Sequence, residues 1–202
     1  AIKIPTDPQY VRNLQREVRG AGVAWMLAQA LKKKCHPERS EESREILRLM
    51  PQNDNCLDLA AIATIADMVP LTGANRVLVK YGLKELNETK RPGLKALIRE
   101  AGLEDKELGV YDVSHLLAPR LNAMGRLEHA MDSLRLVCTK DANRAQELAR
   151  LLNDTNRERQ DLTQENLLHA KTLANKLTSK LIFIVDDSYN QGVIGLVASK
   201  LV

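Results

Sequence analysis

The chain has 202 residues, which is enough for one large domain or for one domain and a piece of another. Hydrophobic residues make up 44% of the chain but aromatic residues only 3%, so the core must consist of Leu, Ile, Val and Ala, a composition that favours close-packed helices. The net charge of +4 is compatible with a polyanionic partner, yet the few aromatic rings exclude an extensive base-stacking platform. A bound nucleic acid would therefore be held by its backbone.

The three cysteines, Cys35, Cys56 and Cys138, are far apart and form no CxxC pair. This spacing indicates neither a zinc site nor a disulfide framework, and it favours a reducing, cytoplasmic location. No apolar run is long enough to cross a bilayer, so we expect no membrane association. Because the chain begins with Ala1 and stops at Val202 inside an apolar helical pattern, we expect a fragment that is cut at both ends.

The N-terminal part is predicted to contain an arm, a helix and a polar insertion. Residues 1–19 hold two prolines and scattered polar side chains, which is typical of an extended arm. The small residues at 20–24 begin a helix that ends in three lysines. They would let this helix pack closely against a neighbour; a phosphate at its N-terminus is the alternative. The polar segment 35–45 breaks the apolar pattern and predicts a solvated loop or insertion.

Residues 56–71 are almost all apolar over four turns, which predicts a buried core helix that Pro70 stops. Asp67 stands near the end of this helix, among apolar neighbours and at the end of the helix dipole that disfavours a negative charge. Such a carboxylate needs a donor, a cation or a metal ion, so Asp67 is either a metal ligand or a hydrogen-bonded structural residue. Asp58, at the favourable end of the dipole, needs no special explanation.

The segment 118–127, Ala-Pro-Arg-Leu-Asn-Ala-Met-Gly-Arg-Leu, places Arg120, Asn122 and Arg126 within seven residues. A planar guanidinium can hold a phosphate through two parallel hydrogen bonds, so the segment predicts an anion site. Its proline and glycine argue against a place inside a long amphipathic helix. The structural alternative is an interhelical turn whose arginines cap carbonyl groups or pair with Glu128.

Helical spacing of apolar residues predicts short helices at 77–86, 92–101 and 128–138. A much longer helix is predicted from Asp141, a suitable N-cap, to about Leu177, with no proline or glycine to interrupt it. It would be about 50 Å long. Its middle, residues 153–161, is polar all round, which is typical of an element that bridges two domains; a solvated helix is the alternative.

The last part of the chain predicts a strand followed by a helix. Residues 181–185 form a short all-apolar run, which is the clearest strand signal in the sequence. After a polar turn, a helix opens at Gly192 and continues through Gly195 to Ser199 and Lys200. A strand, a polar loop and a glycine-started helix can offer backbone N–H groups to an anion, although neither a Walker loop nor GxGxxG spacing is present.

Together these segments resemble the RecJ branch of the DHH phosphoesterase family. They occur in the family's order and span nearly the whole chain, and they are Gly20-Ala-Gly-Val-Ala24, Ala63-Thr-Ile-Ala-Asp67-Met-Val-Pro70-Leu, Asn75-Arg76, Arg91-Pro-Gly93-Leu, Pro119-Arg-Leu-Asn-Ala-Met-Gly-Arg126-Leu, Asn156-Arg-Glu-Arg159 and Gly192-Val-Ile-Gly195-Leu-Val-Ala-Ser199-Lys. Each piece alone is weak, but the combination is specific.

The resemblance implies an α/β protein of which this chain is a mostly helical fragment. Residues 1–140 would be the C-terminal part of a DHH-type catalytic domain, 141–178 a long bridging helix, and 179–202 the first strand and helix of a DHHA1-type domain. The family implies an exonuclease that hydrolyses single-stranded DNA from the 5′ end in DNA repair and recombination, with two Mn²⁺ or Mg²⁺ ions. Such a protein is expected to be a monomer, with single-stranded DNA and a repair helicase or a single-strand-binding protein as partners.

The resemblance also assigns roles to individual residues. Asp67 matches a carboxylate metal ligand of the family. The residues that would face the scissile phosphate as catalytic residues are Arg120, Asn122 and Arg126. The residues that would bind nucleic acid are Arg120, Arg126, Gly192, Gly195, Ser199 and Lys200.

The family's aspartate-rich motif and its Asp-His-His motif do not occur in these 202 residues. We therefore expect the chain alone to be inactive, because one carboxylate cannot hold two metal ions. Two other functions stay open from the sequence. One is hydrolysis of short oligonucleotides or cyclic dinucleotides by another DHH-family enzyme, and the other is a non-catalytic nucleic-acid-binding scaffold.

Overall fold

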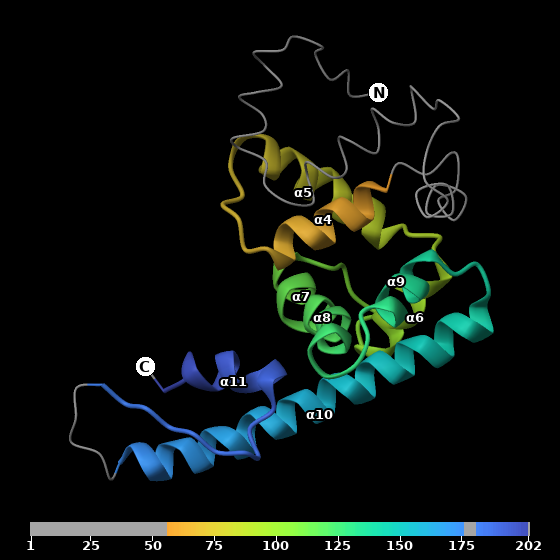
Figure 1. Cartoon of the computed structure of the whole chain (residues 1–202). Helices are drawn as coiled ribbons and strands as arrows, with labels where there is room; N and C mark the ends of the chain where they lie inside the picture. Colours follow the sequence, from red (N-terminus) through yellow and green to blue (C-terminus); the bar gives the residue numbers. More distant parts are fainter. Residues whose placement is uncertain (1–55, 176–180, 202) are drawn as a thin grey trace, which may run out of the picture.

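A computed structural model describes residues 56–175 and 181–201, and Figure 1 shows their arrangement. The predicted helix from Gly20 and the predicted polar insertion at 35–45 lie outside the described residues. The elements are the helices α4 (Leu57–Ala66), α5 (Gly73–Asn87), α6 (Pro92–Glu100), α7 (Val110–Asp112), α8 (Ala118–Leu127), α9 (Met131–Cys138), α10 (Ala142–Ala174) and α11 (Gln191–Ala198), with the π-helix η1 (Val113–Leu117) between α7 and α8.

A larger core lies over the first half of α10. The helices α6, α8 and α9 pack against α10, while α4 packs against α5, η1 and α8 (Figure 1). The buried side chains of this cluster are aliphatic, as the composition predicts, and include Leu86, Leu97, Leu117 and Leu152, all with no exposed surface. Full burial of one leucine side chain stabilises the fold by about 1.5–3 kcal/mol.

A smaller cluster lies beside the second half of α10, where α11 packs against it (Figure 1). Leu167 and Ala170 of α10 meet Val197 of α11 there. The helix α10 therefore carries both clusters, and its role as a bridge between two domains stays a prediction. It has 33 residues, and the predicted N-cap is confirmed because Asp141 accepts hydrogen bonds from the backbone N–H groups of Asn143 and Arg144.

The core helix predicted at 56–71 is shorter than expected. It ends at Ala66, and Met68 has a positive φ of 53°, a conformation that ends a helix. The chain is then held away from helical geometry because Val69 precedes Pro70. Asp67 and Met68 are exposed, so the apolar neighbours of Asp67 in the sequence do not surround its carboxylate in space. The expectation of a buried acid here is wrong.

The predicted strand at 181–185 is also not observed. Residues 56–175 and 181–201 contain helices and no strand. A strand is stable through backbone hydrogen bonds to a neighbouring strand, and the described residues supply no such partner. The side chains of Leu181, Phe183 and Val185 are exposed, while Ile184 packs on the smaller cluster. The described part of the chain is thus mostly helical, and the α/β character stays a prediction.

Candidate nucleic-acid interface

The segment 118–127 is helical, although its proline and glycine argue against a long helix. Together α7, η1 and α8 form one helical run from Val110 to Leu127. Pro119 lies inside this run, directly after the wider turn of η1, where the regular hydrogen-bond ladder of an α-helix is already interrupted and a missing N–H does less harm. One face of α8 is buried through Ala123 and Met124. Arg120, three and four residues earlier, lies on the same face and is partly buried, whereas Arg126 is exposed.

Arg120 is fixed on α8 by two hydrogen bonds. Its Nε donates to Oδ1 of Asn153 on α10 at 3.1 Å, and its Nη1 donates to the carbonyl oxygen of Leu116 in η1 at 2.7 Å. The second bond is the carbonyl cap that the structural alternative predicts. Burial lowers the pKa of Arg120, and the positive charge of Arg157 lowers it further, while Glu100 opposes both effects. The guanidinium is therefore half-buried beside another cation.

Arg126 and Arg159 form a second close pair of cations. Arg126 donates from Nη1 to the carbonyl oxygen of Gly192 at 3.2 Å, which joins α8 to the start of α11. Arg159 of α10 donates from Nε and Nη2 to Oδ1 of Asn156 at 3.3 and 3.0 Å. Burial lowers the pKa of Arg159, and the charge of Arg126 contributes in the same direction. Residues that lie far apart in the sequence thus meet at one place.

We call Arg120, Arg126, Arg157 and Arg159 the guanidinium cluster. None of them forms an ion pair with a carboxylate of the described residues. Five of the six other described arginines do form such pairs, namely Arg91, Arg99, Arg135, Arg144 and Arg150, and the exception is Arg76. Four cations without a paired carboxylate make a site that favours a polyanion, because a phosphate can supply the missing negative charge.

Arg157 and Arg159 are not among the site residues predicted from the sequence. They lie in the segment 153–161, which the sequence presents as polar all round. In the structure this segment has a buried face, since Asn153, Thr155 and Asn156 are each no more than 5% exposed. The signal that could have revealed the site is the spacing of two asparagines three residues apart, followed by two arginines.

The predicted residues of α11 divide into two groups. Gly192 lies at the cluster, and its N–H donates to the side chain of the N-cap Asn190 at 2.7 Å. Gly195 is exposed, with open space where a Cβ would lie. Ser199 and Lys200 are exposed at the other end of α11, about 12 Å further along the helix. Only Gly192 therefore touches the cluster directly, through Arg126.

Two further predicted residues are exposed and lie outside these contacts. Asn122 is exposed on α8. Asp67 is exposed after α4, and the described residues contain no group of three or more His, Cys, Asp or Glu side chains that could hold a metal ion. A single carboxylate does not make a two-ion site, so the described residues do not fit the two metal ions by themselves. The metal role of Asp67 stays a prediction.

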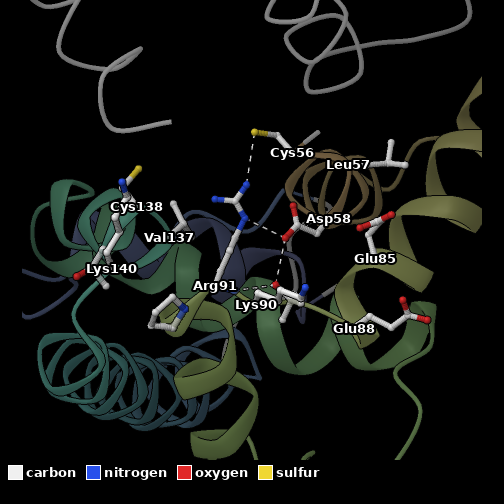
Figure 2. A pocket seen from close by; sticks show the side chains of 13 residues that line it. Cys56, Leu57, Asp58, Glu85, Glu88, Lys90, Arg91, Val137, Cys138 and Lys140 are labelled. Carbon is white, nitrogen blue, oxygen red and sulfur yellow. Dashed lines mark hydrogen bonds and ion pairs between the residues drawn. The ribbon is translucent and has the colours of Figure 1, made fainter. Parts of the chain in front are cut away.

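A pocket of about 650 Å³ lies elsewhere, between the start of α4, the ends of α5 and α9, and the start of α6 (Figure 2). Its centre is an ion pair between Nε of Arg91 and Oδ2 of Asp58 at 3.0 Å, which is almost entirely buried. Asp58 also accepts a hydrogen bond from Thr89. Nothing in the local sequence singles out Asp58, but its carboxylate is a buried partner for Arg91. The lining carries acids and bases together, so this pocket does not favour a phosphate.

Comparison with known proteins finds relatives of this chain. No family model matches the chain. The single-stranded-DNA-specific exonuclease RecJ of Bacillus subtilis is 39% identical over 189 residues, which are 93% of this chain and 22% of that protein. RecJ of Thermus thermophilus is 37% identical over 194 residues, which are 96% of this chain and 27% of that protein. RecJ of Escherichia coli is 32% identical over 193 residues, which are 92% of this chain and 33% of that protein.

Solved structures agree with the sequence comparison. The crystal structure of RecJ from Thermus thermophilus in complex with Mg²⁺ is 37% identical and superposes with a TM-score of 0.65, covering 78% of this chain and 25% of that chain. A structure of exonuclease RecJ bound to manganese is 38% identical and superposes with a TM-score of 0.66, covering 77% of this chain and 40% of that chain. The helices of this chain are thus arranged like a part of the solved RecJ structures. The chain is homologous to RecJ over a part, between about a fifth and a third, of the length of the relatives named above.

Within the described part of the chain, each helix is either too short or too polar to cross a membrane.

Proposed function

We propose that this chain is part of an exonuclease that degrades single-stranded DNA from its 5′ end by phosphodiester hydrolysis. The observation that carries the proposal is the guanidinium cluster, which joins α8, the middle of α10 and the start of α11 in a chain homologous to RecJ. Arg120, Arg126, Arg157 and Arg159 would hold consecutive phosphates of the strand. Base identity would matter little, because the cluster is built of groups that recognise phosphate oxygens.

The described residues supply only some of the groups that such an exonuclease needs. Residues 1–140 and 179–202 would belong to two domains on either side of a bridging helix at 141–178. The described residues contribute phosphate binding and, through Asp67, at most one carboxylate toward Mn²⁺ or Mg²⁺. Structures of RecJ with Mg²⁺ and with manganese support this choice of ions, whose role would be to activate water. The remaining ligands would have to come from elsewhere in the protein.

Substitution of Arg120 by alanine in the full-length protein tests the phosphate role. We expect single-strand cleavage to fall by about tenfold or more, and the slope of binding against salt concentration to decrease by about one, because one phosphate contact is lost. The matched control is Arg144→Ala, which removes an exposed arginine that already pairs with Glu147 on α10. Wild-type cleavage and salt dependence in Arg120→Ala would show that the cluster does not hold the strand.

A further inference from the structure

Two buried asparagines lie in the middle of α10, directly under the guanidinium cluster. Asn153 is 5% exposed and Asn156 is 3% exposed. Asparagine is a poor helix former, and its buried amide must find hydrogen-bond partners. Two such residues inside a 33-residue helix therefore reduce its stability locally. A local loss of stability of this kind is characteristic of functional sites.

Each asparagine binds one arginine of the cluster. Oδ1 of Asn153 accepts from Nε of Arg120, and Oδ1 of Asn156 accepts from Nε and Nη2 of Arg159. Since a guanidinium carries only donors, the amide oxygens must face the arginines. Arg120 also donates from Nη1 to the carbonyl oxygen of Leu116, and after these bonds each arginine still has an unused N–H on Nη1 and on Nη2, at the outer edge of the guanidinium. That outer edge is the one that binds a phosphate through two parallel hydrogen bonds.

The two arginines donate to neutral amide oxygens, and this determines the net charge of the site. A carboxylate in the same place would orient an arginine equally well, but it would neutralise it. The described chain uses carboxylates in this way elsewhere, for example in the pairs Arg91–Asp58 and Arg99–Glu104. At the cluster, two amides orient the arginines without adding negative charge. Arg120 and Arg159 are therefore fixed in direction while each keeps its full positive charge.

We propose that Asn153 and Asn156 are positioning residues that hold Arg120 and Arg159 with their outer edges toward two neighbouring phosphates of a single strand. The assignment rests on the proposed function, since it presupposes that the cluster binds a DNA backbone. It goes beyond that function by identifying the two residues that set the direction and preserve the charge of the arginines.

The test replaces each asparagine by aspartate, which has nearly the same shape, in the full-length protein. Binding of a short oligothymidylate would be measured against salt concentration, with a chelator present so that the strand is not cut. We expect Asn153→Asp and Asn156→Asp each to weaken binding by about tenfold and to reduce the salt slope by about one, because one arginine is neutralised. Their thermal unfolding midpoints should not fall, since each new carboxylate gains an ion pair with its arginine.

The control is Asn143→Asp, which makes the same chemical change at an exposed position on the same helix, about 15 Å from Asn153. It should leave binding unchanged. Aspartate variants of 153 and 156 that bind with wild-type affinity and salt slope would overturn the positioning role and leave the asparagines as packing residues. If Arg120→Ala and Arg159→Ala also bind like the wild type, the proposed function itself fails; if only the arginine variants lose binding, the failure is confined to the asparagines.

Discussion

At Gly192 the start of α11 touches the end of α8. A Cβ built on Gly192 would lie 2.1 Å from the carbonyl oxygen of Arg126, a contact that side-chain rotation cannot relieve because the backbone fixes the positions of both atoms. We expect Gly192→Ala to push α11 away from α8 and to break the hydrogen bond between Arg126 and Gly192. Overpacking of this kind destabilises by about 1–3 kcal/mol. Thermal unfolding and single-strand binding of the full-length protein should both decline.

Gly195 provides the matched control for this substitution. It lies in the same helix, but nothing would meet a Cβ there within 4 Å. Because alanine is the better helix former, Gly195→Ala should stabilise α11 by up to about 1 kcal/mol. Should Gly192→Ala behave like Gly195→Ala, the close approach of α8 and α11 would have no energetic importance.

Asp112 gives a prediction for the pH dependence of stability. Its buried carboxylate accepts the N–H of Gly109 and pairs with Lys106, and these two interactions hold its pKa below the usual value of 3.8 against the opposing effect of burial. A lowered pKa in the folded state means that the stabilisation is complete above the unfolded pKa and is lost as the pH falls through the folded value. Asp112→Asn should therefore lower the unfolding midpoint at neutral pH and make little difference in strong acid. A midpoint difference that does not shrink with acidity would contradict this account.

At the scale of elements, the sequence predicts best where a pattern is long. The length of α10 and its cap at Asp141 were predictable, because no residue in 33 interrupts the helix and an aspartate begins it. The strand predicted at 181–185 is not observed, since apolar residues alone do not supply the neighbouring strand to which a strand must form its hydrogen bonds. The helical form of 118–127 was missed for another reason. Proline disfavours a regular α-helix interior, but Pro119 directly follows the π-helical turn η1, where the regular ladder is already interrupted.

The candidate site was predictable only in part. Two guanidiniums in α8 are visible in the sequence, but their neighbours on α10 depend on which face of that helix is buried. Since residues 153–161 are polar on every side, hydrophobic periodicity gives no information about that face. The meeting of Arg126 with Gly192, 66 residues apart, is a tertiary contact that no local pattern encodes. The roles of all the predicted site residues remain predictions, namely those of Asp67, Arg120, Asn122, Arg126, Gly192, Gly195, Ser199 and Lys200.

At the scale of the whole molecule, α10 fixes the distance between the two packed clusters. The larger cluster reaches as far as Leu152 along this helix, and the smaller cluster begins at Leu167. Between them lies the guanidinium cluster, whose arginines belong to α8 and α10 and which contacts α11 through Gly192. If a single strand lies across these residues, its phosphates are held by parts of the chain whose relative position depends on the straightness of α10.

Gln164→Pro tests this dependence, because Gln164 is an exposed residue of α10 between the two clusters. Proline removes one backbone hydrogen bond and clashes with the preceding turn, so it should kink α10 at a cost of about 3 kcal/mol or more. We expect single-strand binding to fall and amide exchange to rise in residues 181–201, while α4 to α9 keep their protection, since their contacts lie before the kink. Gln164→Ala, which preserves the helix, should bind like the wild type. If the proline variant bound single-stranded DNA as tightly as the wild type, contact between α11 and α8 would not be needed for binding. The binding site would then consist of α8 and the middle of α10 alone.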